Sequence, residues 1–441
     1  MRKTFLRRLL ILFLLTLPFY LSFPEYAEAA PRLQDSGART VIVIDPGHGG
    51  ENRGTIAGEH EEKLMTMTTA LAMYEELLLY DNVEVYLTRS EDTDITLADR
   101  AEFAKSVEAD FLFSIHYNAS ENHELYGSEV WVSSLSPYNG YGYQFGYEFL
   151  SEMKEWGLLV RGVKTRLGTK GDYYGIIRES VNRDIPAVII EHCHVDEAHD
   201  AGFCDSDEKL KEFGRADALA VAKYFGLKSA VLGTDYSGYQ LADPTAGTKA
   251  TLADSTEPDI CQIEFQDADV PNGSLSLTVS GADYDTALLY YSYSLDGGRT
   301  YSSREPWPES DALTGEYADT FTLNLSVPPG TKPEVILRAY NMYDLYRESN
   351  CWVSEQIFPS TPPREAISTE KPVSEELTVI PVGGNTVEEN PGTFLFLLYC
   401  LAGALGLLLF MFLFGYLSLR RRRKRRLQRR KEAGSIWNQQ K

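Results

Sequence analysis

Two histidines and two glutamates in the first half of the chain stand where they could bind a metal ion. His48 follows the run VIVIDPG, His116 ends the run FLFSIH, and Glu61 and Glu62 open a segment with apolar residues at helical spacing. The whole chain has 441 residues and seven histidines, so two that end strand-like runs are informative. Two imidazoles and one carboxylate can hold a catalytic zinc ion that keeps one position for water. The sequence therefore predicts a His/Glu/His zinc site.

Glu191, which ends the run AVIIE, supplies the further group that such a site needs. A carboxylate beside an activated water can take a proton from it and pass the proton on. On the residues alone, simpler roles stay open. His48 could end a turn, His116 could be a core histidine, and Glu62 could stabilise the start of a helix.

The runs that precede these residues predict an α/β domain with a mostly parallel sheet and flanking helices. The expected strands are rich in β-branched and aromatic residues, and the expected helices carry apolar residues at helical spacing. Their alternation gives a layered α/β fold, in which sites lie beyond the carboxyl ends of the strands. The expected strands are 41–47, 83–89, 111–118, 128–134 and 187–193, and the expected helices are 61–79, 97–107 and 207–226.

Six motifs, in order and spacing, give this domain a family resemblance. VIVIDPGHGG, a Glu-Lys pair opening a helix, LTR, SIHYNA, YYGIIRES and IPAVIIEHC resemble the zinc-dependent N-acetylmuramoyl-L-alanine amidases of the type 3 family. The resemblance covers about residues 40 to 228. It implies a bacterial cell-wall hydrolase that cleaves the amide bond between N-acetylmuramic acid and L-alanine in peptidoglycan.

The resemblance also implies roles for single residues. The zinc ligands would be His48, Glu62 and His116, with Glu62 preferred over Glu61 because the family has its ligand directly before a lysine. Glu191 would be the catalytic carboxylate. Three further residues are weaker candidates for positioning the substrate or supporting the ligands, namely Asn118, Arg100 and Arg178.

The residues after Glu191 depart from the family pattern. The family usually has a small residue followed by Gly-Phe, whereas this chain has His192, Cys193 and His194. On a regular strand Cys193 would point to the same side as Glu191, and the two histidines to the opposite side. We expect these three residues to be structural or supporting rather than additional ligands.

Residues 136–150, SPYNGYGYQFGYEFL, are dense in Tyr and Gly and could form a flexible segment near a cleft. Tyrosines on such a segment could stack on sugars or clamp a peptide. They could equally pack an inserted loop against the sheet.

A second domain is expected over residues 259–359. Short alternating runs separated by Pro, Gly, Asn and Asp predict an antiparallel β-sandwich of immunoglobulin or fibronectin type. The amidase-like domain, 39–228, would connect to it through a linker at 229–258. A Pro/Thr/Ser/Glu-rich stalk would follow at 360–392.

Both ends of the chain carry targeting signals. Residues 1–29 have a basic start, an apolar run and small residues before a cleavage site, which indicates a signal peptide, although an uncleaved anchor stays open. Residues 393–417 are 25 residues without charge and predict a transmembrane helix. The basic segment 418–441 should then stay in the cytoplasm. The expected location is the bacterial cytoplasmic membrane, with the catalytic domain outside.

The net charge of the chain limits the classes of partner that it is expected to bind. The two ends, 1–29 and 418–441, hold 15 of the 42 basic and 3 of the 64 acidic residues, so 27 basic and 61 acidic residues remain, a net charge of −34. Nucleic acid is therefore not expected as a partner, whereas peptidoglycan and the membrane are. Two other functions stay open: a zinc carboxypeptidase-like hydrolase of wall peptides and a non-catalytic wall-binding scaffold.

Overall fold

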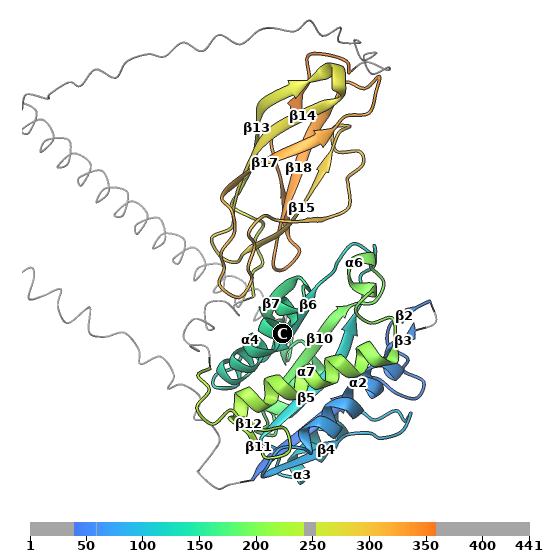
Figure 1. Cartoon of the computed structure of the whole chain (residues 1–441), viewed down its shortest axis with the longest axis vertical. Coiled ribbons are helices and arrows are strands. Elements are labelled where there is room, and N and C mark those ends of the chain that lie inside the picture. Colours follow the sequence, from blue (N-terminus) through green and yellow to red (C-terminus); the bar gives the residue numbers. More distant parts are fainter. Residues whose placement is uncertain (1–38, 59, 242–252, 359–441) are drawn as a thin grey trace, which may run out of the picture. The chain divides into compact units, whose positions relative to one another are not determined.

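A computed structural model describes residues 39–58, 60–241 and 253–358 (Figure 1). These residues all belong to one unit of the chain, Met1–Glu365. The segments predicted as signal peptide, stalk, membrane span and basic tail lie outside the described residues. Within the described ranges, no helix combines the length and the apolar character needed to cross a bilayer.

A six-stranded sheet forms the centre of the first domain. Its strands lie in the order β4-β1-β5-β10-β6-β7. All neighbouring pairs are parallel except β10 and β6, which are antiparallel. The mostly parallel sheet predicted from the sequence is thus confirmed. The bounds are β4 Val83–Leu87, β1 Thr40–Pro46, β5 Phe111–Asn118, β10 Ala187–His194, β6 Ser128–Val132 and β7 Val160–Lys164.

Helices cover both faces of this sheet, because alternate strand residues point to opposite sides. In β1, Ile42 and Ile44 pack into one core with helices α2, α4 and α7, whereas Val41 and Val43 pack into another with α3 and α5. Figure 1 shows α2, α4 and α7 on the face turned toward the viewer. The helices are α2 Glu62–Leu77, α3 Leu97–Ser106, α4 Tyr138–Glu155, α5 Gly175–Val181 and α7 Asp207–Phe225.

Of the two alternatives for the Tyr/Gly-rich segment, the structure shows packing against the sheet, as a helix rather than as a loop. The segment forms helix α4, in which Tyr143, Phe145 and Phe149 are buried. Gly142 and Gly146 lie one helical turn apart, where an added Cβ would come within 2.7 and 2.8 Å of valine side chains of β6 and β7. The glycines therefore let the helix pack closely on the sheet, and the aromatic residues fill the core beside them.

Short elements complete the first domain. A helical turn, α6 (Ala198–Ala201), follows β10. The first residues of the segment predicted as a linker form a small hairpin, in which Ser229 donates to the Leu79 carbonyl. The two-residue strands are β2 Ile56–Ala57, β3 His60–Glu61, β8 Leu167–Gly168, β9 Gly171–Asp172, β11 Lys228–Ser229 and β12 Thr234–Asp235.

Residues 253–358 form a second, all-β domain, which we call the sandwich domain. One sheet has the order β13-β14-β17, and the other has the order β16-β15-β18-β19, with β20 also paired to β18. All these pairs are antiparallel, as predicted, and side chains from both sheets share one core around Trp307. The bounds are β13 Ile260–Asp269, η1 Val270–Asn272, β14 Ser274–Ala282, β15 Leu288–Ser294, β16 Glu305–Pro306, β17 Thr320–Ser326, β18 Glu334–Asn341, β19 Tyr346–Glu348 and β20 Trp352–Val353.

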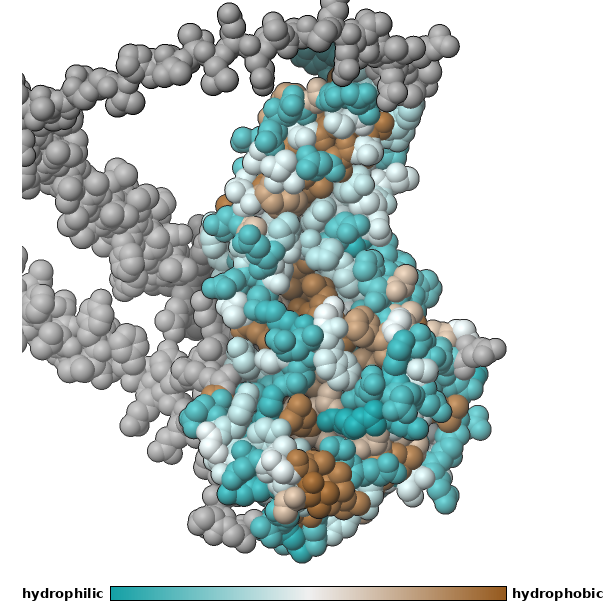
Figure 2. Space-filling model, in the orientation of Figure 1, coloured by the Kyte–Doolittle hydropathy of each residue, from teal (hydrophilic) through white to brown (hydrophobic). Residues whose placement is uncertain are grey.

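The face shown in Figure 2 is largely hydrophilic and is interrupted by separate apolar areas. Several apolar side chains on α2 and at its end are exposed, including Leu64, Leu71 and Leu78. Single exposed apolar residues of this kind are ordinary on folded proteins.

Candidate metal and catalytic site

The turn after β1 explains the spacing of His48. Gly47 lies so close to β5 that an added Cβ would be 2.4 Å from Cε1 of His116. His48 itself has a φ of 63°, a left-handed conformation that non-glycine residues seldom adopt. The turn therefore brings the His48 ring toward the carboxyl end of the neighbouring strand, where His116 lies.

The structure brings together the three residues predicted as zinc ligands, His48, Glu62 and His116, which we call the metal-ligand group. Oε1 of Glu62 lies 3.0 Å from Nε2 of His48 and 3.0 Å from Nδ1 of His116. One ligand atom from each residue can be chosen so that all three lie within 4.8 Å of one another. The two histidine side chains keep 21% and 18% of their surface exposed, so a bound ion would be accessible from solvent.

Glu62, rather than Glu61, belongs to this group. Glu62 begins α2, is buried, and its Oε2 accepts a hydrogen bond from the Thr55 amide at 2.8 Å. Burial raises the pKa of Glu62, but hydrogen bonds with His116 and His48 outweigh it and hold that pKa below its usual range. Glu61 instead pairs with Arg53. Glu62 is therefore charged and already held in place at neutral pH.

Polar side chains hold the His48 ring and the backbone before it. Nδ1 of His48 lies 2.9 Å from Oδ1 of Asn52, which also accepts from the Gly54 amide and is thereby identified as the oxygen. His48 then donates from Nδ1, so Nε2, which faces Oε1 of Glu62, is the nitrogen that would bind a metal ion. Arg89, in the LTR motif, donates to the carbonyls of Pro46 and Gly47 at 3.0 and 2.8 Å.

Arg100 has a supporting position and not a substrate-binding one. It is buried, pairs with Asp45 at 2.7 Å, and donates to the Pro46 carbonyl at 2.8 Å and the His48 carbonyl at 2.6 Å. Arg178 lies apart from the metal-ligand group and donates to the carbonyls of Asp172 and Tyr173. Both arginines thus donate hydrogen bonds to backbone carbonyls.

Glu191 lies beside the metal-ligand group without belonging to it. It pairs in register with His116 of β5 on one side and with Glu129 of β6 on the other. Within the described residues, its Oε2 is shielded from solvent and has no hydrogen-bond partner. Burial, together with the charges of Glu62 and Glu129, raises the pKa of Glu191 well above its usual range. An unpaired carboxylate with a raised pKa suits a group that accepts and releases protons.

Asn118, two residues after His116, forms a hydrogen bond with Glu129. Its Nδ2 donates to Oε1 of Glu129 at 2.9 Å, and its Oδ1 accepts from the Ala119 amide at 3.0 Å. Asn118 follows β5 residue His116 on the same side of the strand. Asn118 therefore lies near both His116 and Glu129 but contributes no ligand atom to the metal-ligand group.

His192 is structural, as expected, but the predicted direction of Cys193 was wrong. His192 is buried and bridges the His116 carbonyl, 3.0 Å from its Nδ1, and Asp217 of α7, 3.0 Å from its Nε2. Cys193 packs into the core beneath α2, α4 and α7, away from the face of Glu191. The pairing of β10 with β5 shifts register between Glu191 and His194, which breaks the regular alternation. The four described cysteines are free thiols.

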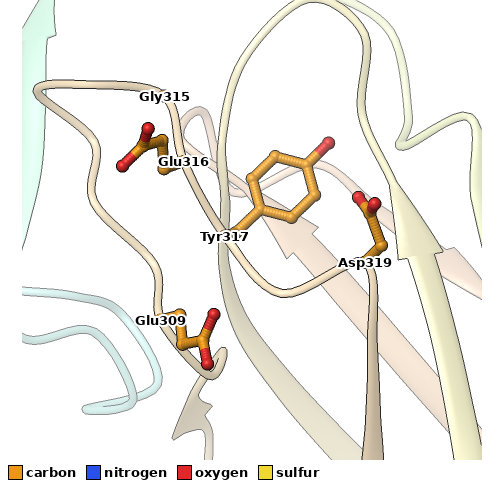
Figure 3. Close-up of a pocket in the computed structure, with 5 residues that line it drawn as sticks. All are labelled: Glu309, Gly315, Glu316, Tyr317 and Asp319. Atoms are coloured by element: carbon orange, nitrogen blue, oxygen red, sulfur yellow. The ribbon is translucent and has the colours of Figure 1, made fainter.

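A separate open hollow of about 450 Å³ occurs in the sandwich domain. Figure 3 shows the side chains that line it, with the carboxylates of Glu309, Glu316 and Asp319 around Tyr317. None of the metal-ligand residues lines this hollow. Because it also contains neither histidine nor Glu191, it is not the candidate active site.

A family model described as N-acetylmuramoyl-L-alanine amidase matches residues 42–223. N-acetylmuramoyl-L-alanine amidase CwlM of Bacillus licheniformis is 34% identical over 187 residues, which are 42% of this chain and 69% of that protein. The sporulation-specific N-acetylmuramoyl-L-alanine amidase of Bacillus subtilis (strain 168) is 29% identical over 188 residues, again 42% of this chain and 69% of that protein.

Among solved structures, one match is the catalytic domain of CwlV, an N-acetylmuramoyl-L-alanine amidase from Bacillus (Paenibacillus) polymyxa var. colistinus. It is 27% identical, has a TM-score of 0.38, and the match covers 43% of this chain and 99% of that chain. The matched region of the family model contains all the residues of the metal-ligand group as well as Glu191, and it stops before the sandwich domain.

Proposed function

This chain belongs to the type 3 family of N-acetylmuramoyl-L-alanine amidases, and from that premise we propose how it acts on the cell wall. The protein is a hydrolase of peptidoglycan that cleaves the amide bond between N-acetylmuramic acid and L-alanine. We propose zinc as its metal, His48, Glu62 and His116 as the ligands, and Glu191 as the catalytic carboxylate. The observation that carries this assignment is the convergence of the three ligand atoms beside the unpaired carboxylate of Glu191.

The residues fit a zinc ion. In tetrahedral coordination with bonds of about 2.1 Å, ligand atoms lie roughly 3.4 Å from one another. Here the glutamate oxygen is 3.0 Å from each histidine nitrogen, and all three atoms lie within 4.8 Å, so small side-chain rotations are enough. Two imidazoles and one carboxylate form a donor set that suits zinc. Bound zinc would lower the pKa of a water molecule and polarise the scissile carbonyl.

The protein's own residues account for the proton transfers. Glu191, with its raised pKa and unpaired Oε2, would accept the proton of the attacking water and deliver it to the nitrogen of the leaving L-alanine. Asn52 would keep the His48 ring in one tautomer, and Arg100 would hold the His48 carbonyl. The chain thus supplies both the proton carrier and a rigid setting for the ligands.

We also propose that the enzyme works at the outer face of the cytoplasmic membrane. Support comes from the sequence alone: an uncharged run at 393–417, the basic residues after it, and an acidic remainder of the chain. Protease added to intact, wall-stripped cells should digest the domains at 39–358 and spare a tag placed after Lys441. Digestion of the tag with protection of those domains would contradict this orientation.

One experiment tests the function directly. The purified full-length chain, loaded with zinc, is incubated with peptidoglycan, and the new termini are identified by mass spectrometry and amine labelling. The expected product is a whole stem peptide with a free amine on L-alanine, and Glu191→Ala should not release it. Release of single amino acids would instead indicate a carboxypeptidase. Binding to the wall without any cleavage by the zinc-loaded protein would indicate a scaffold.

A further inference from the structure

A buried carboxylate that the proposed mechanism does not use lies beside the catalytic one. Glu129 of β6 is 3% exposed and stands directly opposite Glu191 of β10. Its Oε1 accepts hydrogen bonds from Nδ2 of Asn118 at 2.9 Å and Nε1 of Trp131 at 3.0 Å. Directly opposed residues of antiparallel strands share one face of the sheet and lie close together. The position of Glu129 therefore limits where the Glu191 side chain can lie.

Two buried cations hold the other oxygen of this carboxylate. Oε2 of Glu129 accepts from Nε of Arg161 at 2.9 Å and from Nζ of Lys164 at 2.6 Å, and these side chains of β7 are 2% and 1% exposed. Two buried positive charges face a single carboxylate, and a buried charge without a partner is costly. The cluster consequently needs a further negative group.

The sandwich domain provides that group. Nη2 of Arg161 donates to Oδ2 of Asp344 at 2.7 Å, and Nη1 of Arg161 donates to the Tyr290 hydroxyl at 2.7 Å. Asp344 lies in the turn between β18 and β19, and Tyr290 lies on β15. The Arg161 guanidinium thus joins Glu129 of the catalytic domain to two residues of the sandwich domain.

Apolar packing surrounds this ion pair. Leu289, Tyr290 and Met342 of the sandwich domain belong to the same buried cluster as Val160 and Val163 of β7. Gly162, with a φ of 92°, has no room for a side chain, because an added Cβ would lie 2.1 Å from Cε of Met342. The contact is therefore closely packed, unlike the contact expected of a freely moving spacer.

We infer that the sandwich domain is a fixed part of the catalytic unit, and that Asp344 is a positioning residue that acts on Glu191 through Arg161 and Glu129. The inference rests on the proposed function only for the role of Glu191. A spacer or an independent wall-binding module would need no buried ion pair that ends beside the catalytic carboxylate.

The test compares two aspartates of the sandwich domain in the full-length chain. Asp311 also accepts from a lysine of the catalytic domain, Lys154, at 2.8 Å, but that lysine is 53% exposed and does not contact Glu129. Asp344→Asn should lower kcat about 10-fold or more, while KM and zinc content change less than about 2-fold. Asp311→Asn should leave kcat within about 2-fold of the wild type. An unchanged kcat in Asp344→Asn would overturn the positioning role.

A double-mutant cycle shows whether the effect passes through Glu129. If it does, Asp344→Asn should change kcat less than about 2-fold when Glu129→Gln is already present. Two losses that simply multiply would contradict the proposed route. Tyr290→Phe, which removes one hydroxyl from Arg161, serves as the second variant if Asp344→Asn does not fold.

A measurement without substrate separates this inference from the proposed function. In calorimetry of the metal-free full-length chain, the two domains should unfold in one transition in the wild type and in Asp311→Asn, and in two transitions in Asp344→Asn. Separate transitions in the wild type would contradict the fixed docking. If the wild type unfolds in one transition but does not cleave peptidoglycan after zinc is added back, the proposed function is refuted and the docking of the two domains stands.

Discussion

Glu191 and Glu129 stand directly opposite each other on β10 and β6, yet their carboxylates have contrasting surroundings. Although burial raises the pKa of Glu129, the neighbouring Lys164 and Arg161 hold it below its usual range. Glu191 has an oxygen without a partner among the described residues, and its pKa is raised. The two adjacent carboxylates thus have different roles. Glu129 keeps a fixed charge, whereas Glu191 can exchange a proton.

Removing the carboxylate of Glu191 should abolish turnover without releasing the metal. We expect Glu191→Gln to lower kcat on the order of 10²-fold or more, because the amide cannot accept the proton of the attacking water. Zinc content, measured by atomic absorption on the same preparation, should equal that of the wild type. Loss of zinc would instead make Glu191 a ligand.

The same substitution should stabilise the metal-free fold. Because the folded-state pKa of Glu191 is raised, the folded state holds a proton that the unfolded state has lost, and wild-type stability falls as pH rises from about 4.3. Glu191→Gln has no such charge and should be more stable than the wild type at pH 8, with a smaller difference near pH 5. Thermal unfolding at the two pH values measures this. A variant less stable at pH 8 would contradict the raised pKa.

Most of the fold could be predicted because the apolar patterns are regular. β1 has β-branched residues that alternate between two cores, and α7 keeps apolar residues at helical spacing, so their types and approximate bounds follow from sequence. Helix α4 was missed because Tyr and Gly are poor helix formers, and only contact with the valines of β6 and β7 makes glycine favourable there. Tertiary contacts, rather than the local sequence, therefore determine that α4 is helical.

Among the site residues, those that end apolar strands could be predicted from the sequence. His116 and Glu191 end apolar strands and so fall on one rim. Asn52, Glu129 and Arg161 were not predicted, because polar residues of these types occur throughout the chain and only the folded contacts distinguish them. Cys193 was placed on the wrong side because a register shift cannot be read from an otherwise regular strand.

Removal of either histidine ligand should reduce zinc content and stability together. We expect His48→Ala and His116→Ala to retain little zinc after dialysis and to lose the rise in melting temperature that zinc gives the wild type, since the ion binds the folded state. His123→Ala is the matched control, because His123 is 69% exposed and contacts Asp196 outside the group. Full zinc occupancy in either ligand variant would refute the site.

Asn52 should tune the affinity for zinc without being a ligand. Its Oδ1 fixes the proton of His48 on Nδ1, and without this hydrogen bond the ring can rotate and populate the tautomer that cannot bind through Nε2. We expect Asn52→Ala to weaken zinc binding about 10- to 100-fold, a smaller effect than His48→Ala, with kcat largely restored at saturating zinc. Competition with a fluorescent chelator measures the dissociation constant. Asn324→Ala is the control, because Asn324 contacts Ser276 in the sandwich domain, and it should bind zinc like the wild type. An unchanged affinity in Asn52→Ala would show that the His48 ring is positioned by other contacts.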